Sequence, residues 1–168
     1  LVAYSYFPSD KLPLECLQVA EYSFFDWLVV SGAGSGEPAA AIVKQFINQE
    51  GGNLISSVVG CDTKTSPHLA ALANGTISHA LDYDDTHFQH IGHLSAAIFP
   101  ALLALGESAN KTYFDVIDSF LIGAEAAILV GETLGMEHYK AGFHQTATAG
   151  CFGATIALCR LMDLTQTQ

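Results

Sequence analysis

The segment TYFDVIDSFLIGAEAAILVGETLG, residues 112–135, predicts the long helix on which an all-α fold can be built. Thr112, followed three residues later by Asp115, resembles a capping box, which satisfies free amide groups at the start of a helix. Apolar residues then recur at three- and four-residue steps, as on the buried face of an amphipathic helix. They are Ile117, Phe120, Leu121, Ala124 and Ile128. Gly135 is a natural end for this helix.

The same periodicity predicts helices on both sides of this segment, so the fold class is all-α. The expected starts are Pro13, Glu37, Ser66, Ser95 and Thr146. Residues 146–162 are crowded with Ala, Gly and Thr, and there Gly150 and Gly153 are expected to let another helix approach closely. Residues 54–59 are compatible with one short strand. No repeat or linker divides the chain, so residues 1–168 are expected to belong to one domain.

Composition limits the partners that the protein can bind. Half of the residues are hydrophobic, which is enough to bury one sizeable core, and an apolar face with Phe24, Phe25 and Trp27 is expected to lie in it. Six Lys and Arg stand against 17 Asp and Glu, for a formal net charge of -11. This balance leaves no basic surface for nucleic acid or an anionic membrane. No apolar run approaches the roughly 20 uncharged residues of a membrane span.

The four cysteines give a weak indication of the compartment. They show no C-x-x-C pairing and no dense disulfide framework, so reduced thiols are expected. We therefore expect a cytoplasmic protein, or one of the mitochondrial matrix if the source is eukaryotic. The chain starts at Leu1 without a methionine, which is compatible with a processed N-terminus.

Residues 79–95, HALDYDDTHFQHIGHLS, hold four of the seven histidines and three aspartates. His87, His90 and His93 lie at three-residue steps and, with a neighbouring aspartate, offer the nitrogen and oxygen ligands of a zinc or iron site. Gly92 argues against one continuous helix that carries all the ligands, and the stretch has no HExxH pattern. A polar connection of solvated histidines and capping aspartates is the simpler alternative.

An acid/base site is the third hypothesis for this stretch. Asp82 and Thr86 are four residues apart and would share a face if the preceding helix continued through them. A carboxylate near an imidazole such as that of His93 can hold one tautomer and help to move a proton near neutral pH. Asp84 and Asp85 are expected to point to solvent or to cap backbone amides, because three buried aspartates in four residues would repel one another.

A second candidate lies in the segment GFHQT, residues 142–146. A histidine just before a helix is near the positive end of the helix dipole, which lowers its pKa and keeps the imidazole able to accept a proton. His144 stands just before the helix expected at residues 146–162. The alternative is that Thr146 is simply the N-cap and His144 an ordinary surface residue.

Taken together, three segments resemble the MmgE/PrpD family, which includes 2-methylcitrate dehydratase, cis-aconitate decarboxylase and iminodisuccinate epimerase. Two look like successive signature segments: ALANGTISHALDYDDTHFQHIGHLSAAIFPALLALGE at residues 71–107 and GFHQTATAGCFGATIALCRLM at residues 142–162. FDWLVVSGAG, residues 25–34, is similar to the end of the family's opening helix. The resemblance spans essentially the whole chain. It implies the N-terminal part of a mostly helical, usually dimeric domain, with an α/β lid domain later in a chain well over twice as long.

The resemblance also implies a pocket lined by particular residues. Carried over one by one, they are Asp82, Thr86, His93 and His144. Two positions depart from the family pattern, since Leu94 and Gln145 stand where proline is common. Because proline mainly restricts φ, both changes are expected only to relax a turn. The family's catalytic lysine lies beyond Gln168, so these residues make only part of an active site.

The chemistry that the resemblance implies is proton transfer on a small di- or tricarboxylate, with no metal and no organic cofactor. His93 and His144 are expected to transfer protons and stabilise developing negative charge, while Asp82 orients a histidine or the substrate and Thr86 donates a hydrogen bond. A hydro-lyase such as 2-methylcitrate dehydratase is the first hypothesis. Decarboxylation of cis-aconitate and epimerisation of iminodisuccinate are alternatives. A truncated, non-catalytic helical module that dimerises is the rival of a different class.

Overall fold

The computed structural model describes residues 6–165 and residue 167, and the α-helices in this part of the chain confirm the all-α prediction. A short 3₁₀ turn, η2 (Ser9–Lys11), comes first. The next four elements are α1 (Leu14–Gly34), α2 (Pro38–Glu50), α3 (Pro67–Ser78) and α4 (Ser95–Ala109). The last three are α5 (Tyr113–Lys140), α6 (Gln145–Thr148) and α7 (Gly150–Leu161).

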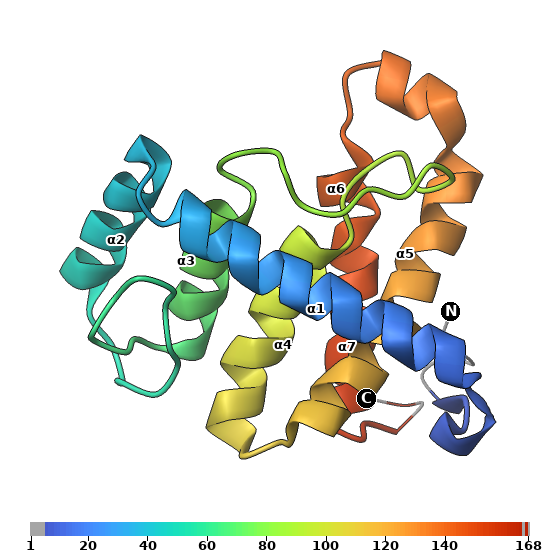
Figure 1. Cartoon of the computed structure of the whole chain (residues 1–168), viewed down its shortest axis with the longest axis horizontal. Coiled ribbons are helices and arrows are strands. Elements are labelled where there is room, and N and C mark those ends of the chain that lie inside the picture. Colours follow the sequence, from blue (N-terminus) through green and yellow to red (C-terminus); the bar gives the residue numbers. More distant parts are fainter. Residues whose placement is uncertain (1–5, 166, 168) are drawn as a thin grey trace.

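Helix α4 lies at the centre of the arrangement and contacts α1, α3, α5 and α7. Helix α1 crosses obliquely over α3, α4 and α5, and α2 packs beside α3 (Figure 1). The most extensive helix pair is α5 with α7. Among the described residues, no helix is both long enough and apolar enough to cross a membrane.

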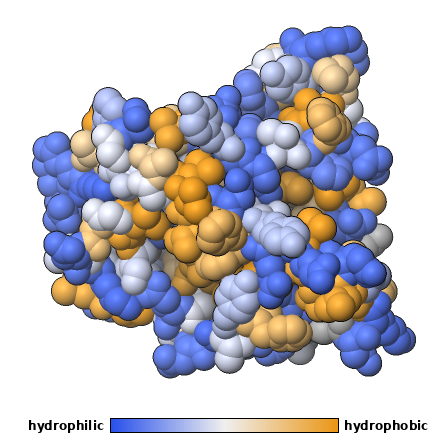
Figure 2. All heavy atoms as spheres, viewed as in Figure 1, coloured by the Kyte–Doolittle hydropathy of each residue, from blue (hydrophilic) through white to orange (hydrophobic). Residues whose placement is uncertain are grey.

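Two hydrophobic clusters hold these helices together. The larger joins α1, α4, α5 and α7 around Trp27, Phe99 and Phe120, and the last two rings stack with centroids 4.0 Å apart. The smaller joins α2, α3 and α4 through residues such as Val43 and Ile77. The expectation that Phe25 lies in the core is wrong, since it is 66% exposed and the buried residues of α1 include Trp27 and Val30 instead. Figure 2 shows apolar side chains on the face that α1 crosses.

The small residues of α7 allow a close helix contact, as predicted. A Cβ atom added to Gly153 would lie 2.7 Å from the carbonyl oxygen of Gly123 in α5 and 2.8 Å from Cβ of Ala127. Such distances leave no room for any side chain, so glycine at this position permits the α5–α7 contact. Gly150 similarly faces Ala97 of α4, with 2.8 Å between the added Cβ and the alanine Cβ.

Helix boundaries agree with the sequence in some places and differ in others. The capping box is confirmed, because Thr112 and Asp115 exchange side-chain and backbone hydrogen bonds at the start of α5. The predicted stop at Gly135 coincides with a break in α5, because the backbone there is non-helical (φ 66°, ψ -174°). A further helical segment of α5 continues beyond this kink to Lys140.

The short strand expected at residues 54–59 is wrong. Only an isolated bridge joins Ser56 to Thr65. Ser56 instead donates its hydroxyl to the carbonyl oxygen of Ala104 at 2.7 Å, which fastens this loop to α4. A ladder needs several consecutive pairs, and here the neighbouring residues bond to side chains such as Glu107.

Candidate functional site

The pocket depends on the connection between α3 and α4, residues 79–94, which runs past α6 to the upper end of α5 (Figure 1). Helix α3 ends at Ser78, so the expected helical face shared by Asp82 and Thr86 is wrong. Asp82 has a left-handed backbone with φ 56°, which aspartate tolerates better than most residues. The connection therefore turns sharply at Asp82.

Three contacts fix the path of this connection. Asp85 accepts hydrogen bonds from the backbone N–H of Ser95 at 3.0 Å and from its hydroxyl at 2.6 Å, so it caps the start of α4. His93 donates its backbone N–H to Oγ1 of Thr146 at 3.0 Å. His90 is fully buried against α5, where a Cβ added to Gly131 would lie 2.9 Å from Cα of His90. The contact between His93 and Thr146 joins the two signature segments.

A pocket of about 310 Å³ opens where the two segments meet. It is lined by His79, Asp82, Thr86, Ile91, Gly92, His93, Tyr139, His144 and Thr146. All four residues predicted for the site are therefore on its wall, although they come from two segments more than 50 residues apart. Ile91 has a left-handed backbone with φ 54°, which is strained for a β-branched residue and costs about 1–2 kcal/mol.

Two histidines and two aspartates form a ring at one side of this pocket. Nε2 of His93 lies 3.2 Å from Oδ1 of Asp82, and Nε2 of His79 lies 3.9 Å from the same oxygen. On the opposite side of both rings, Nδ1 of His79 lies 2.9 Å from Oδ1 of Asp84, and Nδ1 of His93 lies 3.3 Å from Oδ2. The two imidazoles therefore lie between an exposed carboxylate and a buried one.

The two carboxylates differ in their exposure to solvent, and the buried one has the larger effect on the pKa of His79. The side chain of Asp82 is 78% exposed, whereas that of Asp84 is 0% exposed. The hydrogen bond from His79 to Asp84 raises the pKa of His79, and this gain outweighs the opposing effect of burial. The expectation that Asp84 points to solvent or caps an amide is wrong, whereas the same expectation for Asp85 is confirmed by its bonds to Ser95.

His144 forms the opposite side of the pocket. It precedes α6, as the sequence predicted, and is exposed, with its ring edge-on to Tyr139 at a centroid distance of 5.3 Å. The next residue, Gln145, is buried and donates its side-chain amide to the carbonyl oxygen of Gly135 at 3.0 Å. Glutamine in place of proline thus connects this segment to the kink of α5.

Four residues could hold a metal ion. Donor atoms of His79, Asp82, Asp84 and His93 lie within 4.8 Å of one another. This set differs from the one that the three-residue spacing suggested, because His87 and His90 do not belong to it. The ring of His90 is buried, with Nδ1 3.3 Å from the carbonyl oxygen of Ala127. The evenly spaced histidines therefore do not converge.

Comparison with known proteins places the chain in a family. The MmgE/PrpD N-terminal domain matches residues 5–168. The chain belongs to the MmgE/PrpD family. The cis-aconitate decarboxylase-like protein oryM of Aspergillus oryzae is 27% identical over 165 residues, which are 94% of this chain and 34% of that protein. Human cis-aconitate decarboxylase is 26% identical over 158 residues, covering 90% of this chain and 33% of the relative.

The mouse cis-aconitate decarboxylase is 28% identical over 149 residues, covering 85% of this chain and 30% of the relative. The chain thus spans about a third of the length of these relatives. The resemblance found in the signature segments agrees with the matched family.

Sequence reasoning missed three ionisable side chains at this pocket of the MmgE/PrpD chain. His79 and Tyr139 line the pocket, and Asp84 holds the two imidazoles from behind. A signal for His79 was present, because it lies in the histidine-rich stretch just after the predicted helix. No pattern in the sequence marks Tyr139, which reaches the pocket only because α5 continues beyond its kink.

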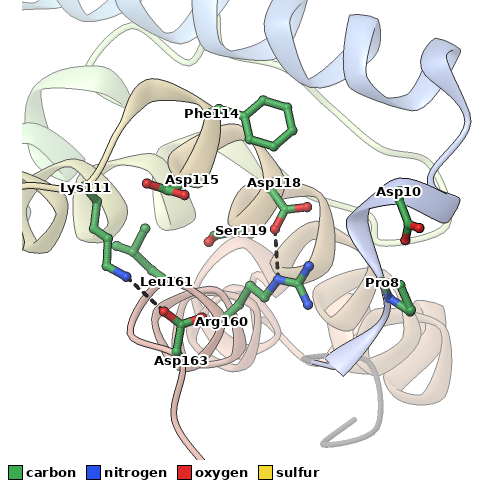
Figure 3. A pocket seen from close by; sticks show the side chains of 10 residues that line it. All are labelled: Pro8, Asp10, Lys111, Phe114, Asp115, Asp118, Ser119, Arg160, Leu161 and Asp163. Carbon is green, nitrogen blue, oxygen red and sulfur yellow. Dashed lines mark hydrogen bonds and ion pairs between the residues drawn. The ribbon is translucent and has the colours of Figure 1, made fainter.

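A larger pocket of about 480 Å³ lies elsewhere, between the ends of α5 and α7 and the N-terminal turn (Figure 3). Its two basic residues already contact carboxylates. Nε of Arg160 lies 2.8 Å from Oδ2 of Asp118, and Nζ of Lys111 lies 3.1 Å from Oδ2 of Asp163. With these charges compensated and no histidine on its wall, this pocket is less suited to proton transfer than the smaller one.

Proposed function

We propose that this chain carries the acid/base half of an MmgE/PrpD lyase that acts on a small di- or tricarboxylate without a metal. The observation that carries the proposal is the 3.2 Å contact between Nε2 of His93 and Oδ1 of Asp82, in a pocket that Thr86 and His144 also line. A carboxylate beside an imidazole at the pocket surface can supply and remove protons near neutral pH.

The pocket residues fit the proton movements of either lyase reaction. In a dehydration, a base removes a proton from the carbon next to a carboxylate, the electron pair forms a double bond, and the hydroxyl group leaves as water after accepting a proton. In a decarboxylation, carbon dioxide leaves, and an imidazolium donates a proton to the carbon that retains the electron pair. His93 and His144 are the proposed proton-transfer groups, and Thr86 is the proposed hydrogen-bond donor.

Dehydration of a 2-methylcitrate-like substrate remains the first proposal, and the relatives named cis-aconitate decarboxylase favour decarboxylation as the second. Epimerisation of iminodisuccinate is the third. No lysine or arginine lines the pocket in the part of the chain that the structure describes. Because carboxylate substrates need positive charge, we propose that activity requires a chain of the relatives' length, acting as a homodimer.

Substitution of the two contacting residues tests the proposed chemistry. In a protein of the relatives' length, Asp82→Asn and His93→Ala are each expected to lower kcat by at least about 100-fold, because a positioned acid/base group contributes 10²–10⁴-fold. Asp62→Asn is the matched control, since Asp62 is an exposed loop carboxylate outside the pocket. Turnover would be measured with 2-methylcitrate, citrate, cis-aconitate and iminodisuccinate.

The outcomes separate the proposal from its rivals. Loss of turnover in both pocket variants with retention in Asp62→Asn supports the acid/base role. Near-normal turnover of both pocket variants would show that these residues are not catalytic. If the wild-type protein of that length turns over none of the four substrates yet forms a stable dimer by light scattering, the non-catalytic dimerisation module is favoured.

A further inference from the structure

The buried carboxylate of Asp84 has no role in the chemistry proposed so far, yet it contacts both imidazoles of the ring. Its side chain is 0% exposed, and its residue exposure is 3%. Oδ1 is bonded to Nδ1 of His79 at 2.9 Å. Oδ2 has no hydrogen-bond partner and lies 3.3 Å from Nδ1 of His93.

Burial of this carboxylate is costly unless positive charge or hydrogen bonds compensate it. No lysine or arginine forms an ion pair with Asp84 in the described part of the chain, whereas His79 and His93 both do. The carboxylate is therefore stabilised mainly by the N–H group of His79, while Nδ1 of His93 bonds to the Asp84 backbone carbonyl oxygen.

The contacts of Asp84 also decide which nitrogen of each ring faces the pocket. A neutral imidazole that donates from Nδ1 has its lone pair on Nε2. For His79 the acceptor is the Asp84 carboxylate, and for His93 it is the Asp84 backbone carbonyl oxygen at 3.1 Å. Both Nε2 atoms are directed to the side of Asp82, which lines the pocket.

We propose that Asp84 is a positioning residue that holds His79 and His93 by their Nδ1 atoms, so that His79 presents a second Nε2 to the pocket beside that of His93. The placement of the two rings supports this role, since their centroids are 4.7 Å apart and both lie on the pocket wall. The effect of Asp84 on catalysis rests on the proposed function. The tautomer that Asp84 sets on His79 does not depend on it. A fixed carboxylate behind an imidazole sets its tautomer and orientation, as do the carboxylates that accept the second N–H of metal-binding histidines.

The tautomers can be measured by ¹⁵N NMR of the imidazole nitrogens in this chain, without any substrate. In the wild type above the titration range, His79 is expected in the Nδ1–H form, because Asp84 is its near acceptor and Asp82 lies 3.9 Å from its Nε2. In Asp84→Asn, His79 is expected to lose its preference for this form, because the amide offers a donor as well as an acceptor. The signals of His93 are expected to change less, because its two nitrogens keep their acceptors, the Asp84 backbone carbonyl oxygen and the Asp82 carboxylate. Asp62→Asn, at an exposed loop carboxylate outside the pocket, is the control and should change neither ring.

Each result decides the proposal. An Nε2–H tautomer of His79 in the wild type overturns the proposal, even if Asp84→Asn does not fold. An unchanged His79 tautomer in a folded Asp84→Asn variant also overturns it. In a protein of the relatives' length, Asp84→Asn should lower kcat by more than about 10-fold with little change in KM, as expected for loss of orientation. Asp84→Asn can change the His79 tautomer in a protein whose wild type shows no lyase activity. That result would support the positioning role of Asp84 and contradict only the proposed function.

Discussion

His90 shows at the scale of one residue how burial decides the role of a histidine. It is 0% exposed, Nδ1 is 3.3 Å from the carbonyl oxygen of Ala127, and Nε2 has no hydrogen-bond partner. Burial lowers the pKa of His90, and this effect outweighs the hydrogen bond to Ala127. His90 therefore packs the connection against α5 as a neutral ring, while His79 and His93 from the same stretch face the pocket.

This burial predicts a loss of stability in acid. The pKa of His90 is lower in the folded than in the unfolded chain. The contribution of neutral His90 to the free energy of unfolding is therefore fully present above the unfolded pKa of about 6.5, and it is lost as pH falls through the folded pKa. His90→Asn cannot take up this proton. Urea unfolding at about pH 7.5 and about pH 5 should show that wild type loses more stability than the variant. An equal loss in both proteins would contradict this account.

At the scale of elements, the contact between α5 and α7 determines where the second signature segment lies. Helix α6 and the start of α7 follow directly from His144, and α7 packs against α5 through Gly153 and Gly123. Because these glycines let the two backbones approach, Thr146 comes within 3.0 Å of the backbone N–H of His93. A small-residue helix thus brings together two segments that are distant in the sequence.

Substitution of one glycine tests this contact. Gly153→Ala is expected to lower the free energy of unfolding by about 1–3 kcal/mol, because the new Cβ would overlap Gly123 O and Ala127 Cβ. Gly32→Ala in α1 is the matched control, since no heavy atom lies within 4 Å of its added Cβ. Alanine is the better helix former, so the control should be stabilised by up to about 1 kcal/mol. Similar urea midpoints for the two variants would show that the α5–α7 contact at Gly153 tolerates a side chain without loss of stability.

At the scale of the whole molecule, charge repulsion is the main electrostatic feature. The formal net charge is -11. In the described part of the chain, four basic residues form ion pairs with carboxylates: Lys64, Lys111, Lys140 and Arg160. The three exposed lysine pairs each contribute about 0–1 kcal/mol, so screening them removes little stability. The Arg160–Asp118 pair is largely buried and is screened less. Screening of the larger excess of negative charge should therefore dominate the response to salt.

We expect moderate salt to stabilise the chain. Raising NaCl from about 0.01 M to about 0.15 M shortens the Debye length from roughly 30 Å to roughly 8 Å. Stability should rise by the order of 1 kcal/mol, equivalent to about 2–4 °C in Tm. Choline chloride at the same ionic strength controls for specific ion binding. A fall in Tm with both salts would mean that the ion pairs outweigh the general repulsion.

The sequence by itself determined the helices and the family. Periodicity and the Thr112–Asp115 capping box are local signals, the small residues of α7 mark a close helix contact, and the signature segments identify a pocket wall. The site residues predicted from the resemblance line one pocket, while their catalytic roles remain proposals.

Only the tertiary structure decided which aspartates and histidines act together. Asp82, Asp84 and Asp85 are chemically similar and nearly adjacent, so spacing cannot tell that one is exposed at the pocket, one is buried behind two imidazoles and one caps α4. Their surroundings come from a connection that turns at φ 56° and is fixed by distant α5 and α6. Burial is a property of the packed molecule, and burial decides what each of these side chains can do.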